Sequence, residues 1–450
     1  MRAIWRFISF ESRLGRTPYL IAAAPAFFAQ HLIVYLLLLG AGKTAPGPLF
    51  WVSPIPFAQT AAQNAPLALL AAMLSLIATA WALASLAFAR AADAGLSGWT
   101  GALAMLPGLQ IPVLIALAIP PSRPGADVAE RPTKSWQVST AALGVLCGAG
   151  VCVVAVALST LVFGVYGYGL FVVSPLVVGA VAGYMANRRQ NLSEGQTLLV
   201  VTLALGLGAA ALIAFMLEGA VCIVMAMPLA LAAGAIGGLF GRSLARRGRA
   251  PPEASVFAAA FLPALFAFEQ AASSPAYFQS TEAVVVAAPP AAVWRAVVAM
   301  GPIPERPSLP FRLGLAYPVD GRIEGVGVGA IRKGYFSTGV AFERITAWRP
   351  GRELAFTVLS DPPMLRELSP YGGLQTPHLL GYYHTGVADF RITPLSGGRS
   401  RLELRTTHVL KLDPAPYWLP FAEWAVHENK LRVLGHFKRV AEASLTQPPH

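Results

Sequence analysis

Long runs of apolar residues constrain this chain more than any other feature, because about 20 such residues are enough to cross the hydrocarbon core of a bilayer. The charge of the chain divides at the same place as these runs. Residues 1–270 hold 15 Lys and Arg and 8 Asp and Glu, whereas residues 271–450 hold 19 and 14. The sequence therefore predicts an α-helical multi-pass membrane region followed by a globular domain. The predicted spans are 18–40, 66–89, 138–161, 168–186, 197–217 and 219–241.

Two further apolar segments leave the topology open. Residues 100–120 contain Pro107 and Pro112, which remove backbone donors and break a helix. If this segment is a re-entrant hairpin, 14 of the 15 cations of the membrane region, all except Lys43, lie on the cytoplasmic side together with the N-terminus. Residues 254–268 would form a helix of about 22 Å, shorter than a bilayer core. Whether either segment spans, and on which side the C-terminal domain lies, stays open at this point.

The net charge of +12 consists of +7 before residue 270 and +5 after it. Most arginines stand singly beside apolar residues, which favours charged loops near anionic lipid over a nucleic-acid surface. The three cysteines lie in apolar runs, so the globular domain contains no disulfide. The first 16 residues lack a signal-peptide cleavage pattern, and they are expected to form a short helix in the membrane interface.

Two short motifs near the N-terminus resemble a known bacterial family. "SRLGRTPYL" (Ser12–Leu20) and "RAADAGLSGW" (Arg90–Trp99) are similar to the two signatures of the inner-membrane family called domain of unknown function 805. The resemblance covers residues 8–120. It implies an inner-membrane location and no particular activity. Ala92 stands where that family usually has a His beside Asp93, so a role tied to that His is not expected here.

The membrane region offers one ionisable candidate and one packing motif. His31 lies in the middle of the first predicted span, where an ionisable side chain is a functional candidate by default. A neutral His that hydrogen-bonds a neighbouring helix is the alternative. Six glycines are spaced for close helix packing: Gly179, Gly183, Gly234, Gly237, Gly238 and Gly241. The predicted organisation is a membrane domain at 1–120, a linker at 121–137, a second helical membrane region at 138–270 and a domain at 280–444.

The stretch "GVGVGAIRKGYFSTG" from Gly325 to Gly339 contains G-x-G-x-x-A, one form of the dinucleotide-binding loop. Such a loop requires a buried strand before it and a helix start after it. Turn-forming residues precede this stretch, and β-branched and aromatic residues without helical periodicity follow it. The sequence therefore excludes a nucleotide site, and the glycines are expected to allow a bend or bulge in a curved sheet.

The remaining pattern predicts an α+β domain of the helix-grip type. A strand at 282–288 precedes a short helix opened by two prolines. A helix at 416–443 carries an apolar stripe of Leu419, Ala422, Val426, Val433, Phe437 and Val440. This arrangement indicates a curved antiparallel sheet closed by one long C-terminal helix. The other predicted strands are 328–337, 339–348, 353–360, 382–395 and 399–411.

Residues 280–444 resemble the START-like superfamily, which includes polyketide cyclases and hydrophobic-ligand binders. The resemblance implies a cavity between sheet and helix that accepts an apolar or amphipathic molecule. Lys430 stands where a similar bacterial subgroup more often has a His. The matching motifs are A-P-P-x-x-V-W at 288–294, G-x-G-A-x-R and F-S-T-G within 327–339, S-P-Y at 369–371, G-G-R-x-R-L at 397–402 and Y-W with R-V-L-x-H-x-K within 417–438.

The turn at Ser396 to Gly398 sets a register for the last two strands. A three-residue loop pairs residues whose numbers sum to 794, which places Phe390 opposite Leu404. The same rule places His384 and His408 on the helix-facing side as diagonal neighbours. These histidines are polar groups of the wall, contacts for a ligand, or a metal pair or acid–base couple, for which Glu343 is a further candidate. No third metal ligand is spaced with them, so neither a metal nor a cofactor is expected.

These observations favour a membrane protein that presents a domain for binding or transfer of a hydrophobic, lipid-like molecule. Membrane lipids and a hydrophobic small molecule are the expected partners, nucleic acid is not, and the oligomeric state is open. An enzyme of the cyclase, hydratase or hydrolase type is the alternative, and a ligand-responsive membrane sensor is a second one. The residues predicted to line the cavity are Arg332, Tyr335, Phe342, His384, Phe390, Leu404, His408, Trp418 and His427.

Overall fold

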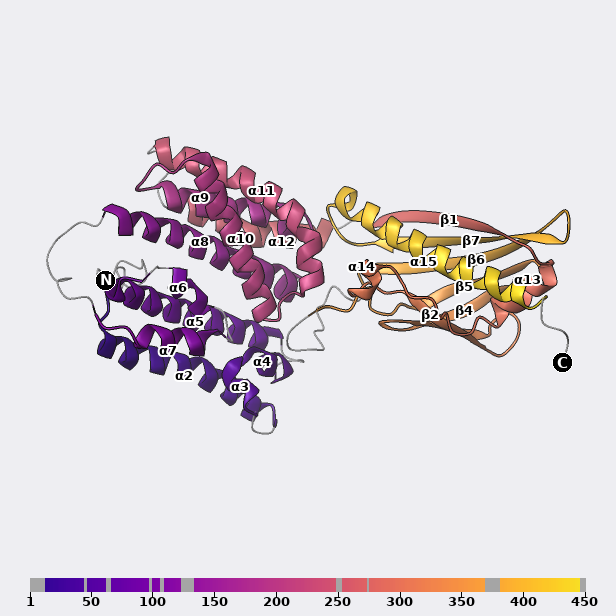
Figure 1. The fold of residues 1–450 in the computed structure, drawn as a ribbon, viewed down its shortest axis with the longest axis horizontal. Helices are drawn as coiled ribbons and strands as arrows, with labels where there is room; N and C mark the ends of the chain where they lie inside the picture. Colours follow the sequence, from indigo (N-terminus) through magenta and orange to yellow (C-terminus); the bar gives the residue numbers. More distant parts are fainter. Residues whose placement is uncertain are drawn as a thin grey trace. The chain divides into compact units, whose positions relative to one another are not determined.

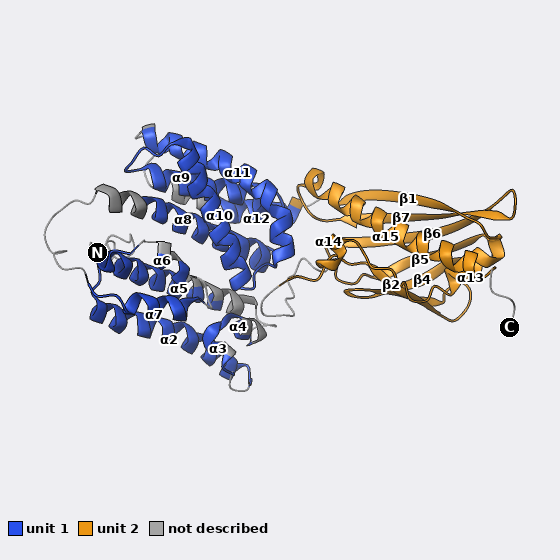
Figure 2. Cartoon of the chain, in the orientation of Figure 1, with its two compact units in different colours: residues 1–271, 369–374 blue, residues 272–368, 375–450 orange. Residues whose placement is uncertain are grey.

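The chain divides into two units, one ending at Ala271 and the other starting at Ala272 (Figure 2). Each unit is described by itself. The predicted interfacial helix and most of the predicted linker lie outside the described residues. The computed structural model describes residues 13–445 except 44–46, 62–65, 97–98, 106–108, 123–132, 248–252, 273–274 and 369–380.

The first unit is helical, as its apolar runs predict (Figure 1). Five described helical segments are long and apolar enough to cross a membrane: Arg16–Gly40, Thr140–Phe163, Gly169–Asn187, Glu194–Ala214 and Ala220–Arg246. Each corresponds to a predicted span, and the predicted span at 66–89 is likewise helical. The main helices are α2 (Arg16–Gly40), α5 (Pro66–Ala94), α8 (Thr133–Ala157), α9 (Ser174–Asn187), α10 (Glu194–Ala214) and α11 (Ala220–Arg247), with π-helical turns η2 (Leu158–Phe163) and η3 (Gly169–Val173) and short helices α3 (Leu49–Val52) and α4 (Ile55–Ala61).

Both doubtful apolar segments are helical, but in different ways. Residues 100–120 do not form one continuous helix. They consist of α6 (Trp99–Ala102), η1 (Leu103–Met105) and α7 (Gln110–Ala118), and Pro112 lies in the first turn of α7, where a missing donor is tolerated. A return to the same side of the membrane stays a prediction. The helix expected at 254–268 is longer than predicted, because α12 runs over Glu253–Ala272 with Pro263 inside it.

Glycines bring α9 and α11 into backbone contact, as their spacing predicts. A Cβ atom added at Gly179 would lie 2.0 Å from the carbonyl oxygen of Gly234, and one at Gly237 would lie 2.0 Å from that of Leu176. No side chain larger than hydrogen fits at such a distance. The glycines therefore serve helix packing within the membrane unit.

The second unit is a seven-stranded antiparallel sheet in the order β1-β7-β6-β5-β4-β3-β2, with a long terminal helix across it (Figure 1). This confirms the predicted helix-grip class. The strands are β1 (Ala276–Val286), β2 (Pro318–Glu324), β3 (Ile331–Phe336), β4 (Gly339–Arg349), β5 (Glu353–Ser360), β6 (Tyr383–Leu395) and β7 (Arg399–Leu410), and the helices are α13 (Pro290–Val298), α14 (Leu309–Arg312) and α15 (Ala415–Ala443).

The glycine-rich stretch is the turn of a hairpin. Strand β2 precedes it, although the sequence pattern predicted only turn residues there, and β3 follows it as an antiparallel partner. Gly325, Gly327 and Gly329 have φ values of 94°, 88° and 91°, which L side chains rarely adopt. A strand, not a helix, follows the glycines, so the helix start that a dinucleotide-binding loop requires does not stand there. The expected bend or bulge is instead a reversal of the chain.

An apolar core fills the interior around α13 and the C-terminal half of α15. Val293 of α13, Leu402 of β7 and both Leu434 and Phe437 of α15 are fully buried in it. Val440, predicted to lie on the buried stripe of this helix, is instead 36% exposed, and Ala441 takes its place in the core.

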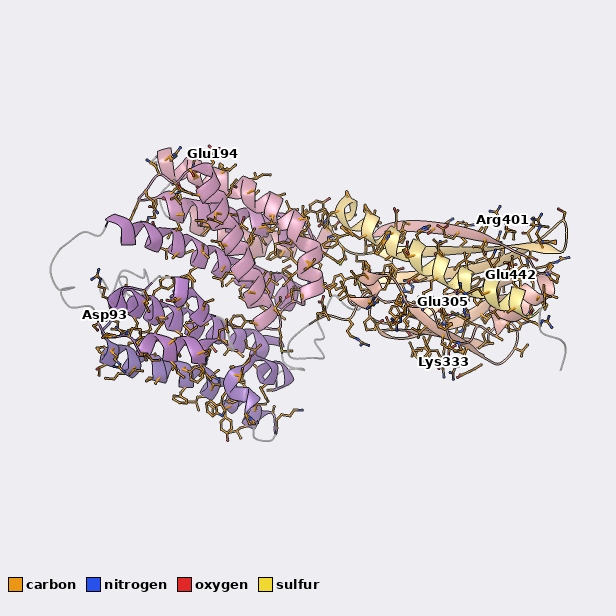
Figure 3. All side chains as sticks on the ribbon, viewed as in Figure 1. Asp93, Glu194, Glu305, Lys333, Arg401 and Glu442 are labelled. Carbon is orange, nitrogen blue, oxygen red and sulfur yellow. The ribbon has the colours of Figure 1, made fainter. Side chains whose placement is uncertain are left out.

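Polar contacts hold the same end of α15 in position. Glu442, labelled in Figure 3, accepts a hydrogen bond from the backbone N–H of Ala287 at 2.7 Å. Lys438 donates to the carbonyl oxygen of Val285, also at 2.7 Å. Arg439 forms an ion pair with Glu305 at 2.6 Å. The helix is therefore fixed at its C-terminal half, whatever its other half binds.

Candidate ligand site

The interior between the sheet and the N-terminal half of α15 differs from the apolar core. Its sheet wall carries hydroxyl and imidazole groups, and α15 contributes an amine. We call this set the interior polar cluster; it consists of Tyr383, Thr385, Thr406, His408 and Lys430.

A β-bulge decides which side chains of β6 join the cluster. Phe390 pairs with Leu404, as predicted, but the register shifts by one between Thr385 and Ala388. His384 therefore pairs with Val409, and Thr385 pairs with His408. Because neighbouring residues of a strand point to opposite faces, this shift turns Tyr383 and Thr385 inward and His384 outward.

The prediction that His384 and His408 face the helix together is consequently wrong. The Nδ1 atom of His384 lies 2.5 Å from a carboxylate oxygen of Asp361, and the His384 side chain is 44% exposed. His408 is buried. Gly386 lies in the bulge, where an added Cβ would come within 2.8 Å of the Thr407 hydroxyl. The register set by the turn at Ser396 to Gly398 therefore holds only as far as this bulge.

His408 is held by hydrogen bonds at both ring nitrogens. Its Nδ1 lies 2.7 Å from the Tyr383 hydroxyl, and its Nε2 lies 2.7 Å from the Thr406 hydroxyl. The ring also stacks on Phe278 of β1 at a centroid distance of 4.8 Å. Burial, helped by the nearby charge of Lys430, lowers the pKa of His408 to about 3. The imidazole is therefore neutral at physiological pH.

Tyr383 is neutral for the same reason. Burial raises the pKa of its phenol above the usual value, so it remains a hydroxyl that donates or accepts a hydrogen bond. Thr385 lies 3.4 Å from both this hydroxyl and the His408 ring. The wall of the cluster is thus polar but uncharged.

Lys430 contributes the charge of the cluster. Its side chain is 4% exposed, and its Nζ has no hydrogen-bond partner among the residues that the structure describes. Burial lowers the pKa of the amine to about 8, against the opposing effect of Glu282. Glu282 is itself 2.7 Å from His427, which is half-exposed at the edge between β1 and α15. The predicted cavity residue His427 therefore contacts a strand carboxylate.

A second charged pair lies inside the sheet, at β3 and β4. Arg332 and Glu343 pair directly across the two strands and form a buried ion pair. The guanidinium also lies 3.3 Å from the sulfur of Met300 and 4.8 Å from the ring centroid of Phe356. Burial raises the pKa of Glu343, and Arg332 opposes that shift. Glu343 is therefore bound to a cation rather than to a histidine.

Two predicted cavity residues point away from the interior. Phe342 alternates with the buried residues Ala341 and Glu343 and is 44% exposed. Tyr335 lies one residue beyond the inward Gly334, and Arg322 covers its ring from the outer face at 5.5 Å. Strand alternation is the physical reason, because Arg332 and Tyr335 are three positions apart in β3 and their side chains therefore point to opposite faces.

The other predicted residues lie inside. Phe390 and Leu404 belong to the apolar core, and Trp418 is buried near the start of α15. In the membrane unit, His31 is buried and its Nδ1 lies 2.9 Å from the carbonyl oxygen of Phe27 in its own helix. The His31 ring also contacts the rings of Phe50 and Trp51 in the short helix α3, each at a centroid distance of 5.2 Å. The adjacent Gln30 bonds the side chain of a glutamine in α7.

Comparison with known families places the N-terminal segment. Residues 7–128 match the family described as "Protein of unknown function (DUF805)". The first segment of this chain is therefore similar to that family. Its second signature motif holds a buried guanidinium: Arg90 donates to the carbonyl oxygen of Leu117 at 3.1 Å and pairs with Asp93, which is labelled in Figure 3. The hydrogen bond to Leu117 joins α5 to the end of α7 within the matched residues.

The C-terminal unit is similar to several solved structures. They include the Zhui aromatase/cyclase from Streptomyces sp. R1128, with 17% identity over 38% of this chain and 96% of that one and a TM-score of 0.26. A truncated norcoclaurine synthase from Thalictrum flavum has 13% identity over 39% and 98%, with a TM-score of 0.24. No curated protein matches. The helix-grip assignment accordingly rests on the strand order and on α15.

Among the described residues, no group of three His, Cys, Asp or Glu side chains is placed to hold a metal ion. The sequence pattern did not identify Tyr383, Thr385 or Lys430 as site residues. For Lys430 a signal existed, since it follows Val426 by four residues and precedes Val433 by three, which is the spacing of the buried stripe. For the two residues of β6, the available signal was Gly386, the glycine within the bulge.

Proposed function

We propose that this protein is a membrane protein whose helix-grip unit binds or transfers an amphipathic, lipid-like molecule between the sheet and α15. The observation that carries the proposal is a change in the side chains that line the space between the sheet and α15. Around α13 the space is filled by apolar side chains, whereas beside the N-terminal half of α15 it is bordered by Phe278, Val426 and the interior polar cluster.

This division suits a molecule with an apolar body and a polar end. Ligand sites are commonly apolar hollows with a few placed polar groups that fix orientation. The hydroxyls of Tyr383 and Thr385 and the amine of Lys430 are such groups, and all three are on the inward side of their elements. The apolar membrane helices of the same chain support membrane lipids as the source of the ligand.

Binding without chemistry is favoured over an acid–base mechanism. His408 has both ring nitrogens engaged and a pKa of about 3, so it is a weak base at neutral pH. Glu343 is paired with Arg332, and His384 faces outward with Asp361. No hydrogen bond or ion pair between described residues joins these three candidates into one catalytic group.

We place the protein in the bacterial inner membrane with its N-terminus in the cytoplasm, as the positive-inside rule predicts. The domain limits proposed from the sequence change in three places: the second helical region starts at Thr133, where α8 begins, and ends at Ala272 with α12, and the helix-grip unit starts at Ala276 with β1. Its ligand would come from the bilayer, the nearest reservoir of amphiphiles.

The experiment compares two variants of neighbouring residues on β1. Ser280 faces inward opposite Thr406, whereas Thr281 is exposed on the outer face opposite Arg405. Full-length protein purified in a mild detergent is extracted, and the bound lipids are identified and quantified by mass spectrometry. We expect Ser280→Phe to lose a lipid species that wild type and Thr281→Phe retain in stoichiometric amounts. Equal lipid content in all three proteins, each folded by circular dichroism, would contradict the proposal.

A further inference from the structure

The amine of Lys430 lacks what a buried cation requires. An ammonium group removed from water is strongly destabilised unless an anion or several acceptors replace the lost hydration. Lys430 is 4% exposed, and no acceptor lies within hydrogen-bond distance among the residues that the structure describes. A partner of opposite charge would complete the site.

The charged groups nearest to Lys430 do not fill this role. Glu282 acts on Lys430 only through space, and its own carboxylate is bonded to His427 at 2.7 Å. The imidazole of His408 has Tyr383 and Thr406 as its partners. The position of Lys430 on the buried stripe, between Val426 and Val433, directs the amine at the interior rather than at solvent.

We propose that Lys430 is the counter-ion for a single negative charge on the headgroup of the bound amphiphile, an inference that rests on the function proposed above. The ammonium group has three donors, and the hydroxyls of Thr385 and Tyr383 lie in the same cluster. An oxygen acid with one charge, either a carboxylate or a phosphodiester, accepts such hydrogen bonds. A second charge would lack a second cation and would be repelled by Glu282.

The test uses full-length protein in uncharged maltoside micelles and an uncharged probe, a photoreactive derivative of hexadecanol. Labelling of peptides from β1, β6 and α15 reports occupancy of the proposed hollow. Unlabelled hexadecanol, palmitate and phosphatidylglycerol then compete with the probe. The measured quantity is the concentration of hexadecanol that halves the labelling, divided by the concentration of each anion that halves it.

The counter-ion assignment predicts that Lys430→Met lowers this ratio about tenfold relative to wild type, the loss expected for one charged hydrogen bond. Lys430→Arg keeps the cation and should retain most of the ratio. Lys333→Met removes an exposed cation on β3, labelled in Figure 3, and should leave the ratio unchanged. Because all variants are measured in the same micelles, partition of the competitors cancels.

Each outcome separates the two proposals. A reduced ratio for palmitate alone assigns a carboxylate. A reduced ratio for phosphatidylglycerol alone assigns a phosphodiester, and reduced ratios for both anions assign any monoanion. An unchanged ratio in Lys430→Met, with the probe still attached to the C-terminal unit, overturns the counter-ion assignment but leaves the proposed function. Absence of labelling in that unit overturns the proposed function itself. If Lys430→Met fails to fold, Lys430→Gln is measured in its place, and an unchanged ratio relative to wild type gives the same refutation of the counter-ion.

Discussion

Removing the charge of Lys430 should stabilise the protein when no ligand is bound. Burial lowers the pKa of this amine from 10.5 to about 8. A difference of one pKa unit corresponds to about 1.4 kcal/mol, so the buried ammonium costs about 3 kcal/mol at pH 7. Lys430→Met keeps the length of the side chain without the charge. We expect it to raise the free energy of unfolding of the C-terminal unit by up to that amount.

The dependence on pH follows from the sign of the shift. Because the pKa is lower in the folded state, the unfolded chain binds more protons between about pH 8 and pH 10.5. The stability of wild type therefore rises with pH through this window, and its full deficit is present below pH 8. At pH 9.5 the advantage of Lys430→Met should shrink to about 1 kcal/mol.

Pulse proteolysis in a urea series measures this on the full chain after removal of bound lipid. Survival of peptides from β7 and α15 gives the unfolding midpoint of the C-terminal unit at pH 7.0 and pH 9.5. Lys333→Met, which removes a surface cation paired with Glu324, serves as the control and should change the stability by less than about 1 kcal/mol, equally at both pH values. A Lys430→Met protein less stable than wild type at pH 7, or an advantage that does not shrink by pH 9.5, would refute the reasoning.

Three other substitutions test the packing. Gly237→Leu should destabilise the membrane unit by about 3 kcal/mol or more, because its backbone touches α9, whereas Gly195→Ala, with open space around it, should be tolerated. Retention of the wild-type size-exclusion peak after heating in detergent checks this. Glu343→Gln leaves a buried guanidinium unpaired and should cost about 3–5 kcal/mol in urea unfolding, against less than about 1 kcal/mol for Glu324→Gln in a surface pair. Arg90→Ala should abolish the protease resistance of the α5–α7 region, and an unaltered digestion pattern would count against its structural role.

Periodicity predicted the elements that depend on long, regular patterns. The membrane helices and α15 follow from apolar runs and stripes, and the β6–β7 register followed from one turn, since Phe390 does pair with Leu404. Strand β2 was not predicted because proline and glycine at Pro318 and Gly321 match the composition of a turn. Its pairing with β3 supplies backbone hydrogen bonds that local composition does not reveal.

The candidate site was less predictable because it depends on local irregularity. A single extra residue near Gly386 exchanges which side chains of β6 face inward, and no period-two pattern contains that shift. The burial of Lys430 was not predicted, because a lysine on an apolar stripe usually extends its amine into solvent. Its burial is a tertiary property, set by the distance between α15 and the sheet.

The most direct test of the central claim is a crystal structure of the full chain purified together with its native lipids. The account predicts an elongated ligand between the sheet and the N-terminal half of α15. Its polar end should lie about 3 Å from the Nζ atom of Lys430, and its apolar body should contact Phe278 and Val426. An interior closed by the protein's own side chains, with Lys430 bonded to one of them, would contradict it.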